Sequence, residues 1–193
     1  MGAVSLVFHP LSRKSLSDLI KSCGTPSHIF AILDSFRSLL DVPDSKNDPI
    51  LVSSKSFSGF LTNPNRCYDQ RFFVNPSVHH EKILLSCLDL MKHRLKKNIC
   101  DLDDYAVLSE VKDLSARRDA CIESSLKYAC KFWAKHLSNI PGYTPHLKRV
   151  QEAIDEFFAK DLLCWIEVLS ILGHLGIALY AINDIRQWCI SVS

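Results

Sequence analysis

Apolar residues recur at the spacing of a helix face along most of the second half of the sequence, and this periodicity most limits the possible fold. The first run follows Asn75 and Pro76, a pair typical of the N-cap and first turn of a helix. Its stripe has the spacing i, i+4, i+7 and i+11: Leu84, Leu88, Met91 and Leu95. The next run keeps that rhythm with Ile122, Leu126, Ala129, Trp133 and Leu137. Each stripe predicts an amphipathic helix that buries one face.

Three more helices are predicted further along. Pro141 and Pro145 separate the second run from a third, whose stripe is Leu147, Val150, Ile154 and Phe157. Residues 162–172 are apolar nearly all round, which is typical of a central buried helix. The last helix begins at Leu175, with an apolar side of Ala178, Ile182, Ile185 and Cys189 and a water-facing side of Asn183, Asp184, Arg186 and Gln187. Helices joined by short loops predict an antiparallel array.

The first 66 residues have no single long period. Their pattern of apolar and polar residues changes about every ten residues, which predicts short elements of different types. Residues 3–8 look like the end of a helix, and residues 12–23 predict a helix with Leu16, Leu19 and Ile20 on one face. Gly24 ends that helix. Thr25 and Pro26 then predict the start of a second helix, whose stripe is Ile29, Ile32, Leu33 and Phe36.

Two short β-prone runs come next, at residues 38–42 and 49–53, and the turn-forming stretch PDSKND separates them. A hairpin after two helices is the winged-helix arrangement. We therefore expect a mainly α fold, with a winged-helix subdomain (helices plus a short β-hairpin) at residues 1–66. An antiparallel helical array, a linker or bundle, follows at residues 67–193. The polar connection at residues 100–120 has no period that predicts its structure.

Composition narrows the class of protein. Hydrophobic residues make up 47% of the 193 residues, which excludes disorder and is enough to fill a core. The formal net charge of +2 is too small to indicate a nucleic-acid or membrane partner. The eight cysteines lack the spacing of zinc sites, and several lie within apolar helical patterns. With no charged-then-apolar leader at the start, we expect a reducing, cytoplasmic setting.

Residues 162–182 are apolar and long enough to cross a bilayer. Glu167 would be costly inside that bilayer, and no flanking group of Lys or Arg fixes an orientation. Gly173 and Gly176 are typical of a helix stop and restart. We therefore expect two buried helices that meet at Gly173, and no membrane partner.

Several stretches together resemble a known architecture. They are HPLSRKSLSDLI (9–20), LDSFRSLLDVPDSKNDPILV (33–52), SFSGFLTNPNRC (56–67), FFVNPSVHHEKILLSCLDLMKHRLKKNIC (72–100), SLKYACKFWAKHL (125–137) and LLCWIEVLSILG (162–173). This combination resembles the winged-helix region, and the helices after it, of fungal STAND-class NTPases of the NACHT type, the architecture of vegetative-incompatibility proteins. The resemblance spans almost the whole chain.

That resemblance implies a place within a larger order: nucleotide-binding core, small helical domain, winged helix, further helices, then a repeat-built sensor. This chain would hold the third and fourth parts and would couple the core to the sensor. The sequence contains no GxxxxGK[ST] motif to cradle phosphates, so we expect no enzyme activity and no cofactor. The implied partner is a NACHT-type NTPase core or a full-length relative, in cis or in trans.

The stretch at residues 53–64, SSKSFSGFLTNP, is where the resemblance would place a nucleotide contact. The family pattern is roughly His-Lys-Ser-Phe-x-Asp-Phe-Leu, and its His contacts the phosphate of bound ADP. Ser54 stands in the place of that His, and Lys55 follows it. Ser54 and Lys55 are therefore the candidate residues for a vestigial nucleotide-sensing position. The simpler interpretation is a packed helix that a Ser side chain caps.

A DNA-binding winged helix is the alternative function. The predicted second helix offers Arg37 as its always-charged cation and also includes Asp34, while Arg13, Lys14 and Lys46 are scattered. DNA affinity needs several clustered cations, so we expect no nucleic-acid partner.

The remaining patterns are interpreted as structural. His79 and His80 point about 100° apart on a helix, so they favour a helix start over a metal site. The basic run at residues 91–97 is typical of a helix C-terminus. The pairs Cys87 with His93 and Cys130 with His136, and the tryptophans Trp133, Trp165 and Trp188, are assigned to packing.

Overall fold

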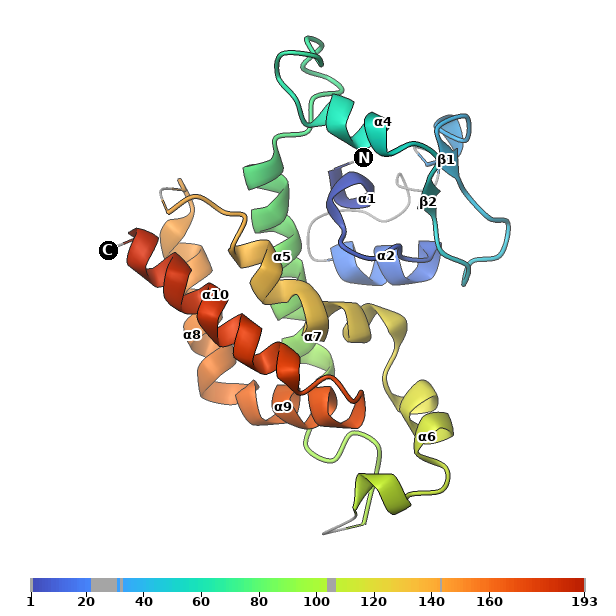
Figure 1. Cartoon of the computed structure of the whole chain (residues 1–193), viewed down its shortest axis with the longest axis vertical. Helices are drawn as coiled ribbons and strands as arrows, with labels where there is room; N and C mark the ends of the chain where they lie inside the picture. The colour runs from blue at the N-terminus through green and yellow to red at the C-terminus, as the bar shows by residue number, and fades with distance from the viewer. Residues whose placement is uncertain (1, 22–30, 32, 104–106, 143, 193) are drawn as a thin grey trace.

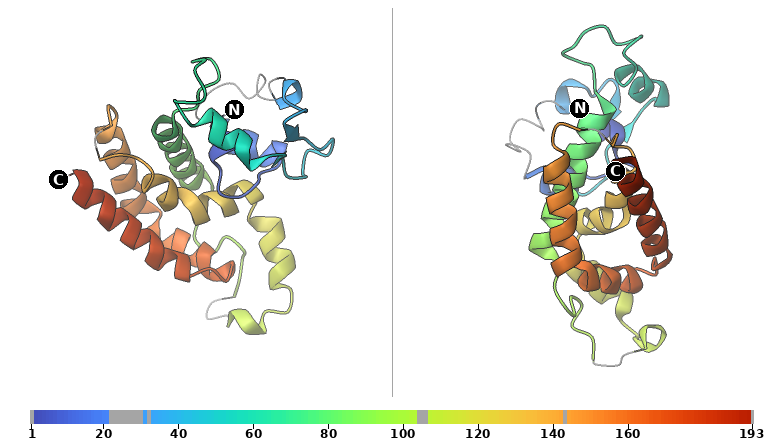
Figure 2. Two further views of the ribbon diagram at one scale, coloured as in Figure 1. Left: turned by 45° about the horizontal axis from the view of Figure 1, so that its top comes forward. Right: turned by 90° about the vertical axis from the view of Figure 1, so that its left-hand side faces the viewer.

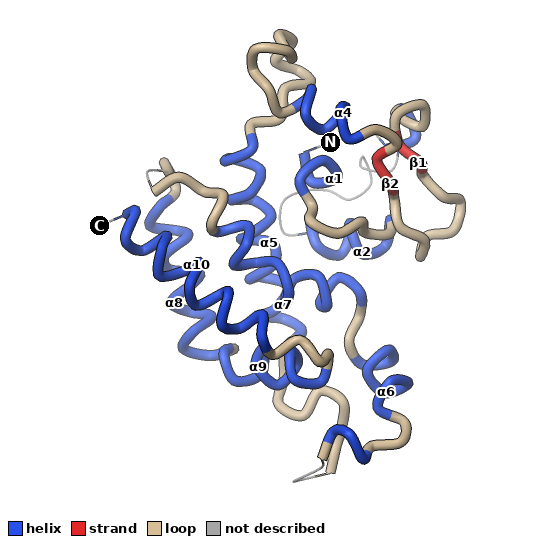
Figure 3. Tube along the Cα trace, viewed as in Figure 1, coloured by secondary structure: helices blue, strands red, loops and turns tan. Residues whose placement is uncertain are grey.

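The computed structural model describes residues 2–21, 31, 33–103, 107–142 and 144–192, and it is mainly α with one short antiparallel hairpin (Figures 1 and 3). The N-terminal elements are α1 (Gly2–Leu6), α2 (Arg13–Ile20), β1 (Leu40–Asp41), β2 (Leu51–Val52) and α4 (Lys55–Leu61). The longer helices follow: α5 (Pro76–Arg94), α6 (Leu114–Cys121), α7 (Ser124–Leu137), α8 (Leu147–Lys160), α9 (Leu162–Ile171) and α10 (Gly176–Val192). The predicted fold class is confirmed at this level.

The hairpin is paired to the segment that precedes α2. Within the hairpin, Leu40 pairs with Val52 and Asp41 with Leu51. An isolated antiparallel bridge then joins Ser12 to Pro49, next to a 2.9 Å hydrogen bond from Ile50 N–H to the carbonyl oxygen of Leu11. The start of α2 is therefore tied to the start of β2. The start of the helix predicted from Thr25 and Pro26 lies outside the described residues, as do Ile29 and Ile32 of its stripe. Residues 33–35 are helical, Leu33 is buried and Phe36 packs against the core, as that stripe predicted.

α5 and α7 lie at the centre of the molecule. α1, α2 and α8 pack against α5, while α2 and α10 pack against α7, as the ribbon views show (Figures 1 and 2). The buried side of α5 includes Leu84, Leu88 and Met91, and that of α7 includes Ala129 and Trp133, as their stripes predicted. One continuous cluster of buried side chains joins these helices to Leu16, Leu19 and Leu40 of the N-terminal segment. The predicted boundary at residues 66 and 67 falls in the loop between α4 and α5.

Aromatic rings fill the space between α7, α8 and α9. The Trp133 ring lies 4.8 Å from that of Phe157 and 5.8 Å from that of Trp165, measured between centroids. The Trp165 indole N–H donates a 2.8 Å hydrogen bond to the carbonyl oxygen of Cys130. These contacts place Trp133 and Trp165 in the core, as their positions on the helical stripes predicted.

α9 ends where the sequence predicts it to end. Gly173 has φ +69°, its N–H bonds to Ser170 at 2.9 Å, and the N–H of His174 bonds to Leu169 at 2.8 Å. This is the Schellman arrangement, in which the left-handed residue is usually Gly. Among the described residues, no helix is both long and apolar enough to cross a membrane.

Two predictions about the last helices are wrong. α9 is not buried all round: Trp165, Val168, Leu169 and Ile171 are buried, but Leu163 is 79% exposed. In α10 the buried residues are Ala178, Ala181 and Trp188, whereas Ile182 and Cys189, predicted on the same side as Ala178, are exposed. α10 packs against α7, and its small side chains Ala178 and Ala181 are buried in the common core together with Trp188. Packing therefore set the helix rotation, because apolar residues occur on several sides of α10.

Candidate functional site

The predicted nucleotide-sensing position lies at the start of α4. Ser54 is the N-cap of this helix, but its side chain makes no capping bond and instead lies 2.6 Å from the hydroxyl of Ser56. The helix predicted here is present, but the prediction that a Ser side chain caps it is wrong. Lys55 is the first helical residue, and its side chain lies outside the described part of the structure.

The apolar side of α4, predicted to be Phe57, Phe60 and Leu61, is only partly buried. Leu61 is buried and Phe57 lies against the core, while Phe60 is 38% exposed with the Arg66 guanidinium 6.0 Å from its ring centroid. Core packing accounts for Phe57 and Leu61. Ser54 itself is exposed and its hydroxyl is engaged by a neighbouring hydroxyl.

His80 takes part in a buried network that joins three segments. The Nδ1 atoms of His80 and His136 lie 2.8 Å apart, and the hydroxyl of Tyr128 lies 2.7 Å from Nε2 of His136. The Phe8 N–H donates to the same hydroxyl at 3.2 Å. The network links Phe8, two residues after the end of α1, to α5 and α7. Among the described residues, no three His, Cys, Asp or Glu side chains are grouped so as to hold a metal ion.

The proton positions follow from this chain of contacts. Because Tyr128 accepts from Phe8, its own proton is free to donate to Nε2 of His136, and His136 Nδ1–H can then donate to His80. Both rings are neutral in this arrangement. Burial, with His80 and Lys135 nearby, lowers the pKa of His136 to about 3, and burial with His79 nearby lowers the pKa of His80.

Two cations of the basic run at residues 91–97, Lys92 and Arg94, are paired with carboxylates on other helices. Lys92 Nζ lies 2.9 Å from Glu156 of α8, and Arg94 lies 3.8 Å from Glu123 at the start of α7. Hydrogen bonds from Lys160 and Lys92 lower the pKa of Glu156 to about 2. These cations fasten the end of α5 to two other helices, so the run is a structural helix terminus.

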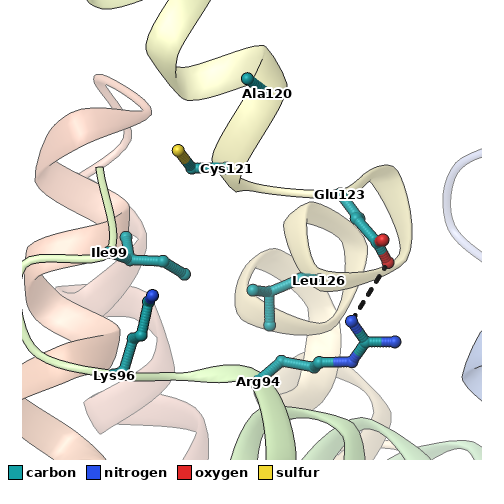
Figure 4. Close-up of a pocket in the computed structure, with 7 residues that line it drawn as sticks. All are labelled: Arg94, Lys96, Ile99, Ala120, Cys121, Glu123 and Leu126. Carbon is teal, nitrogen blue, oxygen red and sulfur yellow. Dashed lines mark ion pairs between the residues drawn. The ribbon is translucent and has the colours of Figure 1, made fainter. Parts of the chain in front are cut away.

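A cavity of about 260 Å³ lies beside this run. Figure 4 shows Arg94 and Lys96 on one side of it and Ala120 and Cys121 of α6 on the other. Ile99, Glu123 and Leu126 complete the lining, and the Arg94–Glu123 ion pair closes one end. The residues that line it combine two cations, a carboxylate and an accessible thiol.

The two arginines near the hairpin, Arg13 and Arg37, are also paired with carboxylates. Arg13 lies 3.0 Å from Asp34, and Arg37 lies 3.1 Å from Asp34 and 3.4 Å from Asp44. Each carboxylate offsets positive charge that a DNA phosphate would otherwise meet. This part of the described surface therefore gives the DNA-binding alternative no support.

The largest feature that the sequence analysis missed is an exposed apolar stripe on α10 and the residue before it. The α10 stripe consists of Leu175, Leu179, Ile182 and Ile190. Leu179 is 73% exposed and Ile182 is 56% exposed, while Arg186 lies between them and Ile190 on the same side of the helix. A run of exposed apolar residues on one helix face is typical of a surface that packs against another protein or domain. The signal in the sequence is that apolar residues occupy more of α10 than one buried face can use.

Comparisons of the chain with models of protein families, with curated proteins and with solved structures found no match.

Proposed function

We propose that this chain is a non-catalytic coupling segment of a cytoplasmic STAND-type signalling NTPase, acting between a nucleotide-binding core and a repeat-built sensor. The observation that carries the proposal is the α10 stripe, which leaves one side of the last described helix ready to pack against a neighbouring domain. In the architecture that the sequence resembles, the sensor follows the helices to which α10 corresponds. The sensor is therefore the occupant that we assign to the stripe.

The packing of the N-terminal segment supports a mechanical role. α2 contacts both α5 and α7, and α1 contacts α5. Glu123, next to the start of α7, lies 3.7 Å from Lys14 of α2 and 3.8 Å from Arg94 of α5. Because these elements share one core, a displacement of the N-terminal segment would carry the central helices with it. Such a segment transmits movement between the domains on either side of it.

The test is a binding measurement between the full chain and a full-length NACHT-type receptor, by light scattering and titration calorimetry. We expect a complex with the wild-type chain. The double variant Leu179→Asp with Ile182→Asp should weaken it by at least about tenfold, because two exposed apolar anchors are lost. Both side chains are exposed, so the fold should be retained, which circular dichroism and the melting temperature can verify.

Asn183→Asp is the matched control, since it adds a negative charge at an exposed position of the same helix without removing apolar area. It should bind as the wild type does. Absence of a complex, or equal binding by the double variant and the wild type, would overturn the proposal.

A further inference from the structure

The exposed Cys121 thiol, at the end of α6, lies close to a second thiol, that of Cys100, which is buried in the turn after α5. Arg117 of α6 donates a 2.9 Å hydrogen bond to the carbonyl oxygen of Asp101 in that turn, and Ile99 of the turn lines the same cavity as Cys121. The Cys121 side chain also lines the cavity shown in Figure 4, which solvent molecules and small solutes can enter. An accessible thiol next to a buried one is the arrangement that a disulfide-forming pair requires.

The turn that holds Cys100 is held in place on both sides. Asn98 has φ +51°, and its side-chain amide makes two 2.8 Å hydrogen bonds with the backbone of Leu102. The Asn98 N–H donates a 3.1 Å bond to Glu167 of α9. These bonds keep Cys100 at a fixed place beside α6, so a bond between the two sulfurs needs movement mainly on the α6 side.

Cys121 is the thiol of the pair that a small oxidant can reach first. It is exposed and lines the cavity together with Arg94, Lys96 and Glu123, whereas Cys100 is buried. Burial, with Cys121 next to it, raises the pKa of Cys100 to about 11. Cys100 therefore remains a thiol at neutral pH and does not compete for the oxidant, and it must give up its proton to the departing hydroxyl group as it attacks the oxidised Cys121 sulfur.

We propose that Cys121 and Cys100 form a redox-active pair that hydrogen peroxide converts to a disulfide. The Cys121 sulfur attacks the peroxide, so that an S–O bond forms, the O–O bond breaks and water leaves. Cys100 then attacks the sulfur of this sulfenic acid, an S–S bond forms, and the S–O bond breaks with loss of a second water. Two thiols lose two electrons and two protons, and one peroxide becomes two waters. The product ties α6 to the turn after α5.

The test uses the reduced full chain, treated with hydrogen peroxide, alkylated and digested with trypsin. Cleavage after Lys97, Lys112, Arg118 and Lys127 places the two cysteines in separate peptides, 98–112 and 119–127. We expect mass spectrometry to find these peptides joined, at the sum of their masses less two hydrogens. In Cys100→Ser, Cys121 should instead accumulate as a sulfenic acid that dimedone traps.

Cys189→Ser is the matched control, because Cys189 is also an exposed thiol, and it should leave the joined peptide unchanged. The melting temperature gives a second measurement. It should rise by several degrees on oxidation of the wild type, because a cross-link restricts the unfolded chain, and stay constant for Cys121→Ser. The proposal is overturned if Cys189 is oxidised while peptides 98–112 and 119–127 remain separate, or if the two join only in denaturant.

Discussion

The imidazole rings of His80 and His136 come from different helices, yet their Nδ1 atoms lie 2.8 Å apart in the interior. This distance allows one proton between the two nitrogens, so the folded state favours neutral rings. The Phe8 ring stacks on that of His80 at a centroid distance of 5.8 Å and packs at a tilt against that of His136 at 4.6 Å. Lys135 Nζ lies 4.5 Å from the Phe8 centroid. A proton added to either ring would meet a cation and an apolar surface.

Acid should therefore destabilise the fold. The pKa of His136 is about 3 in the folded chain against 6.5 for a free histidine, so the unfolded chain binds more protons below pH 6.5. The stability that the neutral ring contributes is complete above that pH and is lost as the pH falls towards 3. We expect the free energy of unfolding, measured in urea, to fall by about 1 kcal/mol for each pH unit below 6.

The histidine variants separate this effect from general acid denaturation. His136→Gln should lower stability at pH 7 and reduce the dependence on pH between 6.5 and 5. His93→Gln, at an exposed position on α5, should keep the slope of the wild type. A slope unchanged by His136→Gln would show that another group controls the acid response.

Two serines that precede helices should differ in their contribution to stability. Ser12 caps α2, since its hydroxyl accepts the N–H of Ser15 at 3.1 Å, whereas Ser54 makes no such bond to α4. Ser12→Ala should lower the free energy of unfolding by about 1 kcal/mol, and Ser54→Ala should change it by less than about 0.5 kcal/mol. Chemical denaturation of both variants checks this, and equal losses would contradict it.

Two glycines should respond to alanine with opposite signs. A Cβ on Gly142 would meet the backbone carbonyl of Ser191 at the end of α10, while a Cβ on Gly59 in α4 meets nothing within 4 Å. Gly142→Ala should destabilise by about 1–3 kcal/mol, because the loop or the helix end must move. Gly59→Ala should stabilise by up to about 1 kcal/mol, since alanine is the better helix former. The melting temperatures of the two variants and the wild type test both expectations. A higher melting temperature for Gly142→Ala than for the wild type would contradict the close contact with Ser191.

DNA binding should be weak and only slightly dependent on salt. Asp34 lies 3.0 Å from Arg13 and 3.1 Å from Arg37, so these cations are partly offset. A gel-shift series from low to physiological salt should show a slope of fewer than about two released counterions. Asp34→Asn should raise affinity at low salt by freeing both arginines. Tight, steeply salt-dependent binding by the wild type would instead favour the winged-helix DNA regulator.

The sequence could predict the helices whose polar and apolar sides differ clearly. Leu84 and Met91 in α5, and Val150 and Phe157 in α8, are buried as their spacing indicated. The hairpin followed from its turn-forming residues. In each of these elements the local pattern of apolar and turn-forming residues was compatible with one type of secondary structure and one buried face.

Other features depend on contacts between distant residues. The rotation of α10 could not be predicted, because Ala178 and Trp188 are buried while Ile182, which is also apolar, is exposed, and local apolarity does not choose between these faces. The pairing of His80 with His136 spans 56 positions, and neither residue has a local signal for it. Between residues 100 and 120 the structure contains a 3-10 turn at Leu108–Glu110 and then α6, where the sequence had no usable period.

The packing of α2 against both α5 and α7 also bears on how the protein can be handled. Leu16 and Leu19 are buried among residues of those helices. Cutting the chain near residue 66 would therefore expose complementary apolar surfaces on both fragments. Each fragment alone should aggregate or be degraded by proteases. Mixing the two fragments should restore a folded complex. Purification strategies and truncation screens should therefore retain residues 2–192 as a single polypeptide.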